Sequence, residues 1–312
     1  MSKIMSGPFH PGEIAMQQQL GVAERMAEVG PIAIRQQMPD QHRAFFATQR
    51  TIMVGAIDRT GRPWATMLFG EPGFVLSPNA GLLRIDAVPT TDDPTTAGLQ
   101  EGSPVGLLGL DLATRRRNRV NGRIEAIDDT GFSVTVDQSF GNCPKYIAQR
   151  EILGRHGLND ATPPAEPRFA LDAQDLAIIQ AADTAFIASS HLGEGDWNAK
   201  GVDVSHRGGA PGFLSLVGTR RIRFSDYPGN RYFNTLGNIL LTPGAGLLIP
   251  DFTGGALLHL TGTAKISWGA ELDRRTVEFV IAEAVRRDHA IPWQFSPPEA
   301  APQIAVLKEL GL

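Results

Sequence analysis

The second half of the chain contains a run of polar residues suited to binding an anion. Ser205, His206 and Arg207 are followed directly by two glycines, Gly208 and Gly209. A hydroxyl, an imidazole and a guanidinium can each hydrogen-bond to an anion, and glycines let the backbone come close to it. This run therefore predicts an anion cradle, most simply for a phosphate.

A second polar run follows in "GNRYFNTLGN" (229–238). Its polar members include Arg231, Asn234, Thr235 and Asn238. The last three would share one face of a helical turn, whose free N–H groups suit a phosphate. Each residue alone could be an ordinary polar surface position, but together they extend the predicted cradle.

The only cysteine of the chain lies in "FGNCPKYI", near the middle of the sequence. Pro144 fits the first position of a helix, with Asn142 or Ser139 as its cap, so we expect a helix to begin here. Lys145 and the free backbone donors of that helix would attract an anion. No His–Asp arrangement is evident near Cys143, which we interpret as a small apolar filler and not as a nucleophile.

An arginine-rich stretch, "TRRRNR" (114–119), has two interpretations. Strand alternation would place Arg115, Arg117 and Arg119 on one face and Arg116 on the other. These side chains could protect a solvated edge strand by their charge. They could also contribute to a site shared with the second half of the chain, and the sequence does not decide between the two.

An internal repeat organises the chain. Residues 106–122 align with 246–262 at a constant offset of 140, and 61–74 align with 200–213 at an offset of 139. Such a nearly constant offset indicates a duplicated domain. In this alignment the polar Ser205, His206 and Arg207 stand opposite Thr66, Met67 and Leu68. Chemistry is expected where the two halves differ.

Short apolar runs rich in Val, Ile, Thr and Phe, punctuated by Gly and Pro, predict about six antiparallel strands in each unit. The first two strands form a hairpin over 51–69. A closed or nearly closed barrel would hide so many strand edges. We therefore predict a mainly β (α+β) protein, with two tandem barrels and peripheral helices over 11–30, 40–49, 172–182 and 273–290.

The expected domain boundaries follow from this pattern. The first unit would span 1–154, from the N-terminal helices to the helix after Pro144. A Pro-rich linker and a helix would span 155–182, and the second unit, with its C-terminal helix, would span 183–312.

Composition narrows the function classes. The length of 312 residues fits two domains. A net charge of −4 argues against binding to nucleic acid or to a membrane surface, and a single cysteine excludes an intramolecular disulfide. No P-loop, H-E-x-x-H or C-x-x-C motif is present, and no metal is expected. No run resembles a signal peptide or a membrane span, so we expect a cytoplasmic protein.

The quoted motifs resemble the pyridoxamine 5′-phosphate oxidase-like split-barrel family. The likeness is to its longer, two-unit branch of predicted flavin-nucleotide-binding proteins. It rests on "FGNCPKYI" between the units and on "DVSHRGGAPGF" and "DYPGNRYFNTLGN" in the second unit. It covers most of the chain, from "FHPGE" and "MPDQHRAFF" to "LTG" at 260–262.

The resemblance implies two tandem split barrels with FMN bound at the interface between them. The residues that it implies for the phosphate are Ser205, His206, Arg207, Arg231, Asn234 and Thr235. Those that it implies near the flavin are Asn142, Lys145 and Tyr146. Lys145 or the arginines at 115–119 would stabilise negative charge on the flavin ring.

Three functional hypotheses remain. The first is an FMN-dependent oxidoreductase that acts on a small-molecule substrate or electron donor, with the redox chemistry supplied by the flavin. The second is a flavin-binding carrier, sensor or storage module without turnover. The third is a pocket for another cofactor, such as haem or a deazaflavin. We expect a homodimer, although two barrels in one chain could also form an internal pseudo-dimer.

Overall fold

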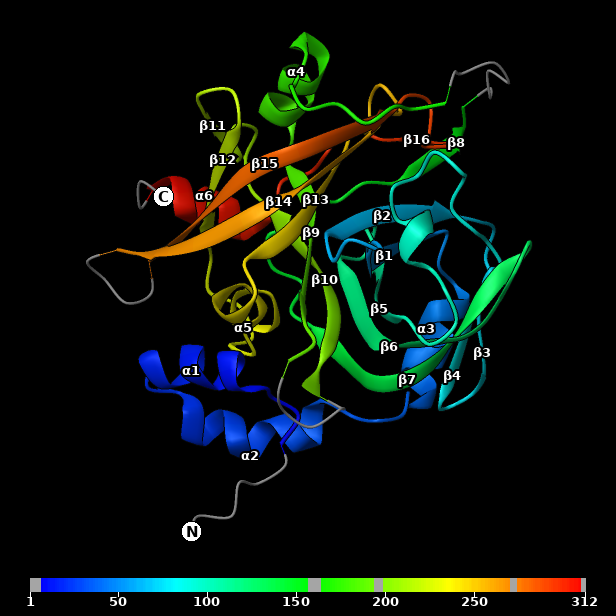
Figure 1. Ribbon diagram of the computed structural model, residues 1–312, viewed down its shortest axis with the longest axis vertical. Helices are drawn as coiled ribbons and strands as arrows, with labels where there is room; N and C mark the ends of the chain where they lie inside the picture. Colours follow the sequence, from blue (N-terminus) through cyan, green and yellow to red (C-terminus); the bar gives the residue numbers. More distant parts are fainter. Residues whose placement is uncertain (1–6, 157–163, 194–198, 270–273, 310–312) are drawn as a thin grey trace.

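A computed structural model describes residues 7–156, 164–193, 199–269 and 274–309, so that 157–163 of the predicted linker lie outside the described residues. Most described residues in strands belong to two seven-stranded antiparallel sheets, with helices at the periphery (Figure 1). The prediction of a mainly β chain with peripheral helices is confirmed.

The first unit contains seven strands, one more than the sequence suggested. They are β1 (Thr51–Ile57), β2 (Pro63–Phe69), β3 (Val75–Asn79), β4 (Leu82–Ile85), β5 (Pro104–Asp111), β6 (Arg116–Asp128) and β7 (Gly131–Asn142). Their order across the sheet is β2-β1-β5-β6-β7-β4-β3. The hairpin formed by β1 and β2 was predicted from the sequence.

The second unit repeats this arrangement. Its strands are β9 (Thr184–His191), β10 (Gly201–Gly208), β11 (Ser215–Val217), β12 (Arg221–Asp226), β13 (Gly244–Pro250), β14 (Leu257–Trp268) and β15 (Arg275–Arg287). Their order is β10-β9-β13-β14-β15-β12-β11, which matches the first unit strand for strand. The duplication is confirmed. A small sheet of β8 (Ile152–Arg155) and β16 (Trp293–Phe295) pairs the segments that follow β7 and β15.

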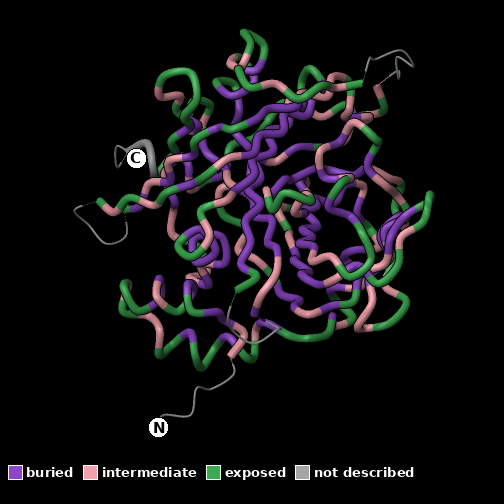
Figure 2. Tube along the Cα trace, in the orientation of Figure 1, coloured by how far each residue is buried: buried purple, intermediate pink, exposed green. Residues whose placement is uncertain are grey.

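The two units share a buried interface. In β1, Val54 faces the core of its own barrel, whereas Met53, on the opposite face, packs in a core with Leu108, Phe186 and Leu248 from both units. Strand alternation explains this, because successive side chains point to opposite faces of a sheet. Figure 2 shows the buried residues running through the strands at the centre of the molecule. The chain thus forms an internal pseudo-dimer.

The predicted helix over 11–30 is two helices, α1 (Pro11–Gln19) and α2 (Ala23–Ala33). Gly21, at φ 65°, breaks the helix between them. Helix α1 packs against α5 (Asn234–Leu241), and a Cβ on Gly12 would lie 2.2 Å from the Gly237 carbonyl oxygen. Glycine is therefore required where α1 meets α5. The predicted helix near 40–49 is α3 (Asp40–Ala47).

Two helix predictions are wrong. The stretch 273–290 forms β15, because Val277, Phe279 and Ile281 alternate inward and the strand pairs with both β14 and β12. The C-terminal helix is instead α6 (Pro302–Glu309). No helix begins at Pro144, because β7 runs to Asn142 in register with β6 and the chain then turns.

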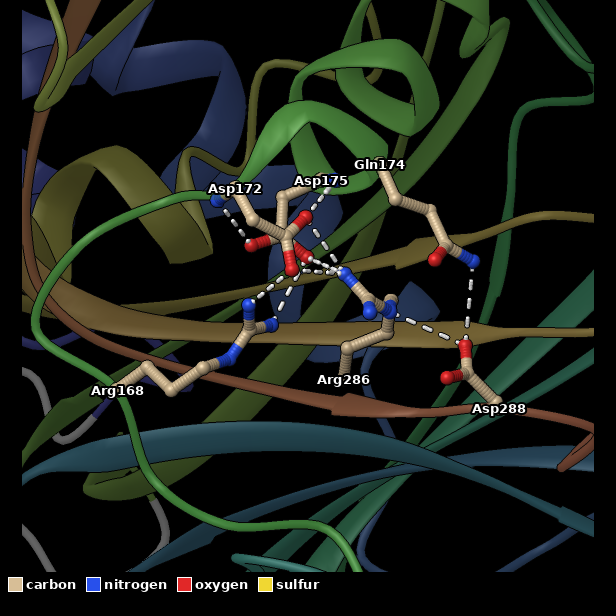
Figure 3. Close-up of polar contacts among 6 residues, drawn as sticks. All are labelled: Arg168, Asp172, Gln174, Asp175, Arg286 and Asp288. Carbon is tan, nitrogen blue, oxygen red and sulfur yellow. Dashed lines mark hydrogen bonds and ion pairs between the residues drawn. The ribbon is translucent and has the colours of Figure 1, made fainter. Parts of the chain in front are cut away.

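A group of ion pairs fixes the end of the linker to the second unit (Figure 3). Helix α4 (Ala173–Ala181), which was predicted, is capped by Asp172 and Asp175 in a reciprocal capping box. Arg168 Nη2 and Arg286 Nη1 both donate to Asp175 Oδ1, at 2.9 and 2.7 Å. Because Arg286 belongs to β15, these contacts join α4 and the linker to the sheet.

Candidate functional site

A cavity lies where the two units meet, between the paired ends of β6 and β7 and the elements β10 and α5. From the first unit, Arg117, Arg119, Asn142 and Cys143 border it. From the second unit it is lined by Ser205, His206, Arg207 and most of the segment 226–236. The site is therefore shared by the two units, as expected for an interface site.

A smaller cavity adjoins the first and shares several of its lining residues, among them Arg117, His206 and Tyr227. It is also bordered by Lys145 and Tyr146. The two cavities together bring into one region all nine residues predicted for a cofactor site: Asn142, Lys145, Tyr146, Ser205, His206, Arg207, Arg231, Asn234 and Thr235. Their role in holding a cofactor stays a prediction.

Positive charge dominates the first cavity. Four arginines line it (Arg117, Arg119, Arg207 and Arg231), and Asp226 is the one carboxylate that does. Burial, together with the neighbouring Arg119 and Arg207, lowers the pKa of Arg117 to about 9. Among the described residues, no carboxylate lies within ion-pair distance of Arg117, although its Nε donates to the Cys143 carbonyl oxygen at 2.7 Å. A bound anion would supply the missing negative charge.

The predicted alternation of the arginines holds in part. Arg117 and Arg119 both reach the cavity, and Arg116 points away, where its guanidinium lies over the Phe45 ring at 4.7 Å. Arg115 does not join the others. It takes a left-handed conformation (φ 58°) in the turn before β6 and donates to the Ile147 carbonyl oxygen.

Asp203 holds Arg119 in position without itself lining the cavity. Arg119 Nη1 donates to Asp203 Oδ1 at 2.9 Å and to Asn234 Oδ1 at 3.1 Å, and Nη2 donates to the Ser205 hydroxyl. Asn238 Nδ2 donates to the second oxygen of Asp203 at 2.9 Å. Asn238 therefore supports the site without lining it. This network holds the Arg119 guanidinium in place, while its buried Nε has no partner.

Arg207 is held by a different carboxylate, Asp226. Its Nη1 lies 3.7 Å from Asp226 Oδ1, and Arg275 donates from both Nε and Nη2 to the other oxygen of Asp226 at 3.0 Å. The Nε of Arg207 is buried without a partner. Because Asp226 is shared between two guanidinium groups, it offsets only part of their charge.

His206 is neutral at physiological pH. Burial, followed by repulsion from Arg117 and Arg207, lowers its pKa well below 6.5. Its ring packs edge-on against Phe186, and its Nε2 has no partner. The imidazole can thus give an N–H group to an anion, but not a charge.

Helix α5 directs its N-terminus at the same cavity. Phe233 to Leu236 line the cavity, and the N-cap Phe233 provides no side-chain hydrogen bond. The first N–H groups of the helix are therefore open to an anion. Arg231 and Phe233, at φ 67° and 64°, adopt the left-handed conformation, which costs non-glycine residues about 1 kcal/mol each. The strained backbone lies at the cavity.

The segment after β7 turns and carries no helix. The Nδ2 of Asn142 is buried without a partner, and Tyr146 takes a left-handed conformation at φ 65°. The Tyr146 ring lies 5.0 Å from that of Tyr227, and its hydroxyl donates to the Pro228 carbonyl oxygen. Asn142 thus offers a donor at the first cavity, while the two tyrosines form an aromatic wall of the second.

The two glycines after Arg207 have a role in packing that the sequence did not indicate. A Cβ on Gly208 would lie 2.0 Å from the Tyr146 carbonyl oxygen, and one on Gly209 would lie 2.4 Å from Phe213 Cβ. Gly208 therefore allows the two units to meet closely beside the cavities. Gly208 also lines the second cavity, and the expected approach of this backbone to a ligand stays a prediction.

Sequence reasoning missed the contribution of α1. Glu13 Oε1 accepts a 2.5 Å hydrogen bond from Asn234 Nδ2, and its Oε2 accepts one from the His10 backbone N–H. Burial, and then the nearby Asp203, raise the pKa of Glu13 well above its usual value. The capping box of His10 and Glu13 was a signal available in the sequence, because Pro11 and Glu13 are typical of the first turn of a helix.

Comparison with protein-family models matches residues 38–162 to the family described as pyridoxamine 5′-phosphate oxidase. The first unit therefore resembles this family. The match covers less than half of the chain, and the second unit is linked to the first by its identical strand order. The resemblance to the pyridoxamine 5′-phosphate oxidase family and its tandem, split-barrel arrangement are confirmed.

Solved structures similar to the chain include two that match about one unit. A putative pyridoxamine 5′-phosphate oxidase from Lactobacillus delbrueckii is 12% identical, with a TM-score of 0.28, and 38% of this chain and 94% of that chain are covered. A FAD-binding protein from Mesorhizobium loti is 10% identical, with a TM-score of 0.27, and 38% and 96% are covered.

A longer match is MrkH of K. pneumonia in its apo state, at 10% identity and a TM-score of 0.23. It covers 82% of this chain and 86% of that chain. No curated protein matches the chain.

The described residues show neither a metal cluster nor a membrane-spanning helix. No cluster of three or more His, Cys, Asp or Glu side chains there could hold a metal ion. None of the helices in that part of the chain has the length and apolar character needed to cross a membrane.

Proposed function

We propose that the interface cavity binds FMN through its phosphate and that the protein is an FMN-dependent oxidoreductase. The observation that carries this proposal is the charge of the first cavity, where four arginines meet one carboxylate. Arginine forks suit phosphate oxygens better than any other side chain. The match of residues 38–162 to the pyridoxamine 5′-phosphate oxidase family supports a flavin as the bearer of that phosphate.

The donors at the cavity fit a phosphate group. Arg207 Nε, Arg119 Nε and Asn142 Nδ2 are buried donors without partners, which is costly unless a ligand or water satisfies them. The uncapped N-terminus of α5 adds backbone donors. Arg117, Arg119 and Arg207 would hold the phosphate, and Ser205 and Thr235 would offer their hydroxyl groups.

The second cavity would receive the flavin ring. Tyr146 and Tyr227 offer an aromatic surface there, and Lys145 offers a positive charge. When bound, the flavin would supply the redox chemistry, and the protein would orient it and stabilise negative charge on its ring. The substrate or electron donor would be a small molecule.

A second candidate function is a flavin carrier or sensor without turnover. It is favoured by the lack of a carboxylate free of ion pairs among the described residues that line the cavities. Asp226 is held by two arginines, and His206 is buried and neutral. Turnover of a reduced nicotinamide or an amine would argue against this candidate.

The first experiment is the absorbance spectrum of the purified protein, followed by identification of the ligand released on heating. Oxidised flavin absorbance and released FMN are expected. A haem or deazaflavin spectrum would replace FMN by that cofactor. A colourless protein that does not take up added FMN would refute the proposal.

A pair of variants then tests the site itself. Arg207→Ala is expected to lower FMN occupancy at least tenfold, because a charge-assisted hydrogen bond contributes about 1.5–3 kcal/mol. Arg223→Ala is the matched control, since Arg223 pairs with Glu278 on the surface of the same unit. Equal FMN occupancy in both variants would contradict the assignment of Arg207.

Oligomeric state and location complete the proposal. We expect a cytoplasmic homodimer of the full chain, in addition to the pseudo-dimer inside each chain. Light scattering of the purified protein at several concentrations tests the dimer, and a monomer throughout that range would refute it.

A further inference from the structure

The duplication creates a second set of positions equivalent to the cradle. Thr66 in β2 pairs with Val54 in β1, as Ser205 in β10 pairs with Ile187 in β9. Val54 and Ile187 occupy the same place, because they pair with Leu107 and with its repeat partner in β13. Thr66 is therefore the structural equivalent of Ser205.

The equivalents of the other cradle residues follow from the same register. In β6 and β7, Arg117 pairs with Asn142, and in β14 and β15, Leu257 pairs with Arg287. Arg287 thus takes the place of Asn142. By the same alignment of strands, His259 takes the place of Arg119.

An internal carboxylate fills this second position. The Asp93 side chain is completely buried. Its Oδ2 accepts from the Thr66 hydroxyl at 2.5 Å and from Arg287 Nη1 at 2.9 Å. Its Oδ1 accepts from the backbone N–H and the hydroxyl of Thr95, at 2.9 and 2.6 Å. Hydroxyls, a backbone donor and a guanidinium thus converge on a carboxylate, as the cradle donors would converge on a phosphate.

The charge balance is opposite in the two positions. Arg287 faces two carboxylates, Asp93 and Asp92. His259, the equivalent of Arg119, is buried and bonds to the Ala65 carbonyl oxygen. A further anion at this position would meet two negative groups and one guanidinium, so it would be repelled.

The second position also has no helix equivalent to α5. Where the second unit has α5, the first has only η1 (Thr96–Gly98), a single 3₁₀ turn. Asp93 bonds to the backbone N–H just before this turn. The Thr66 and Thr95 donors and Arg287 Nη1 are therefore satisfied by the chain itself, although Arg287 Nε has no hydrogen-bond partner.

We propose that Asp93 is a built-in replacement for the phosphate in this second position, so that each chain binds one phosphate-bearing cofactor and not two. The inference rests on the proposed function of the open cradle. It assigns the single cofactor to the cavity that contains Arg207.

Equilibrium dialysis tests the proposal with two separate probes, FMN and radiolabelled inorganic phosphate. The wild-type chain is expected to bind one equivalent of either probe, and Arg207→Ala is expected to lose it. Asp93→Ala leaves the donors of Thr66, Thr95 and Arg287 without their acceptor. This variant is expected to bind two equivalents of phosphate but still only one of FMN, because Met67 and Leu68 replace His206 and Arg207 beside the second position.

The outcomes separate this inference from the proposed function. Two equivalents of FMN or phosphate per wild-type chain would overturn the inference and leave the flavin proposal intact. One equivalent of phosphate with no FMN would refute the flavin proposal and support the single anion site. A folded Asp93→Ala chain that gains no phosphate would overturn the role of Asp93. If this variant does not fold, the wild-type count still decides the number of sites.

Discussion

Replacing Arg117 by methionine is expected to stabilise the cofactor-free protein and to weaken its anion binding. Arg117 lies among other arginines with no carboxylate at ion-pair distance in the described residues, and its pKa is lowered from the usual range of arginine to about 9. The lowered pKa means that folding moves the Arg117 cation from water to a buried position beside other positive charges, which disfavours its charged form. Methionine keeps an unbranched side chain of similar reach and removes the charge.

The magnitude follows from the pKa. Lowering the pKa from its usual range to about 9, at about 1.4 kcal/mol per pH unit, gives an upper limit of about 5 kcal/mol. An effective dielectric constant of about 20 inside proteins screens the charges, which reduces the penalty to about 2 kcal/mol. The lost hydrogen bond to the Cys143 carbonyl oxygen costs about 1 kcal/mol. The net expectation is a gain of about 1 kcal/mol in the free energy of unfolding.

The pH dependence has a definite sign. Because the pKa of Arg117 is depressed, the penalty is complete below about pH 9 and is relieved as the pH rises above 9. The advantage of Arg117→Met should therefore be constant near neutrality and shrink above pH 9. FMN or phosphate affinity should fall about 10- to 100-fold, since a charged hydrogen bond contributes about 1.5–3 kcal/mol.

Urea unfolding with and without phosphate measures both effects. Arg119→Met is the matched control, and it should lose about 3 kcal/mol because Asp203 then stays buried without its cation. A destabilised Arg117→Met that keeps its affinity for phosphate would refute the reasoning. It would show that the positive charge of Arg117 is balanced within the protein and does not need a bound anion.

Three further variants test the elements that support the site. Burial, and then His191, lower the pKa of His10 to about 4, so folding stability should fall as the pH drops from 6.5 to 4. His10→Asn keeps a capping side chain and should remove up to about 3 kcal/mol of that loss. Urea unfolding at each pH measures the effect. Gly12→Ala should lower stability by about 1–3 kcal/mol and weaken FMN binding, because its Cβ would force α1 away from α5; thermal unfolding and FMN titration report the two effects. Asp175→Asn should cost about 3 kcal/mol in urea unfolding, because Arg168 and Arg286 lose their buried partner.

Each of these variants has a control. The exposed His289→Asn is the control for the loss of a histidine, and a His10→Asn slope equal to that of the wild type would contradict the burial argument. Gly81→Ala, where the nearest atom is 3.5 Å away, should be tolerated, as should Asp288→Asn at the edge of the ion-pair group. Gly12→Ala or Asp175→Asn behaving like its control would show that the contact is not needed.

The sequence was most informative where the two halves could be compared. A constant offset predicted that Ser205, His206 and Arg207 replace Thr66, Met67 and Leu68, and the shared strand order confirms the alignment. Strand alternation then brought Arg117 and Arg119 to one cavity. These predictions succeeded because the duplication and the period of two are local properties of the sequence.

Helix signals failed where tertiary pairing determined the structure. Pro144 satisfies the rule for a first helical position, yet the pairing of Asn142 with Arg117 continues the strand and the left-handed Tyr146 interrupts any helix. In β15, charged residues between apolar ones imitate an amphipathic helix. Its apolar side chains are instead buried at every second residue from Val277 to Ile281, because two neighbouring strands pair with it.

Parts of the site depend on contacts between segments distant in sequence. Glu13 bonds to Asn234 across 221 residues, and Asp203 bonds to Arg119 across 84. No local pattern marks such partners, because their proximity is created by the docking of α1 and by the interface of the two units. The closure of the second position by Asp93 likewise became evident only from the strand register.

The central claim is that the interface cavity recognises a phosphate carried by a flavin. Calorimetric titration of the wild-type protein with FMN and with riboflavin, which lacks the phosphate, tests it most directly. The account predicts that FMN binds at least 100-fold more tightly, a difference of about 2.7 kcal/mol, and that Arg207→Ala removes most of this difference. Equal affinity for FMN and riboflavin would contradict the account, because the arginine cradle would then have no part in recognition.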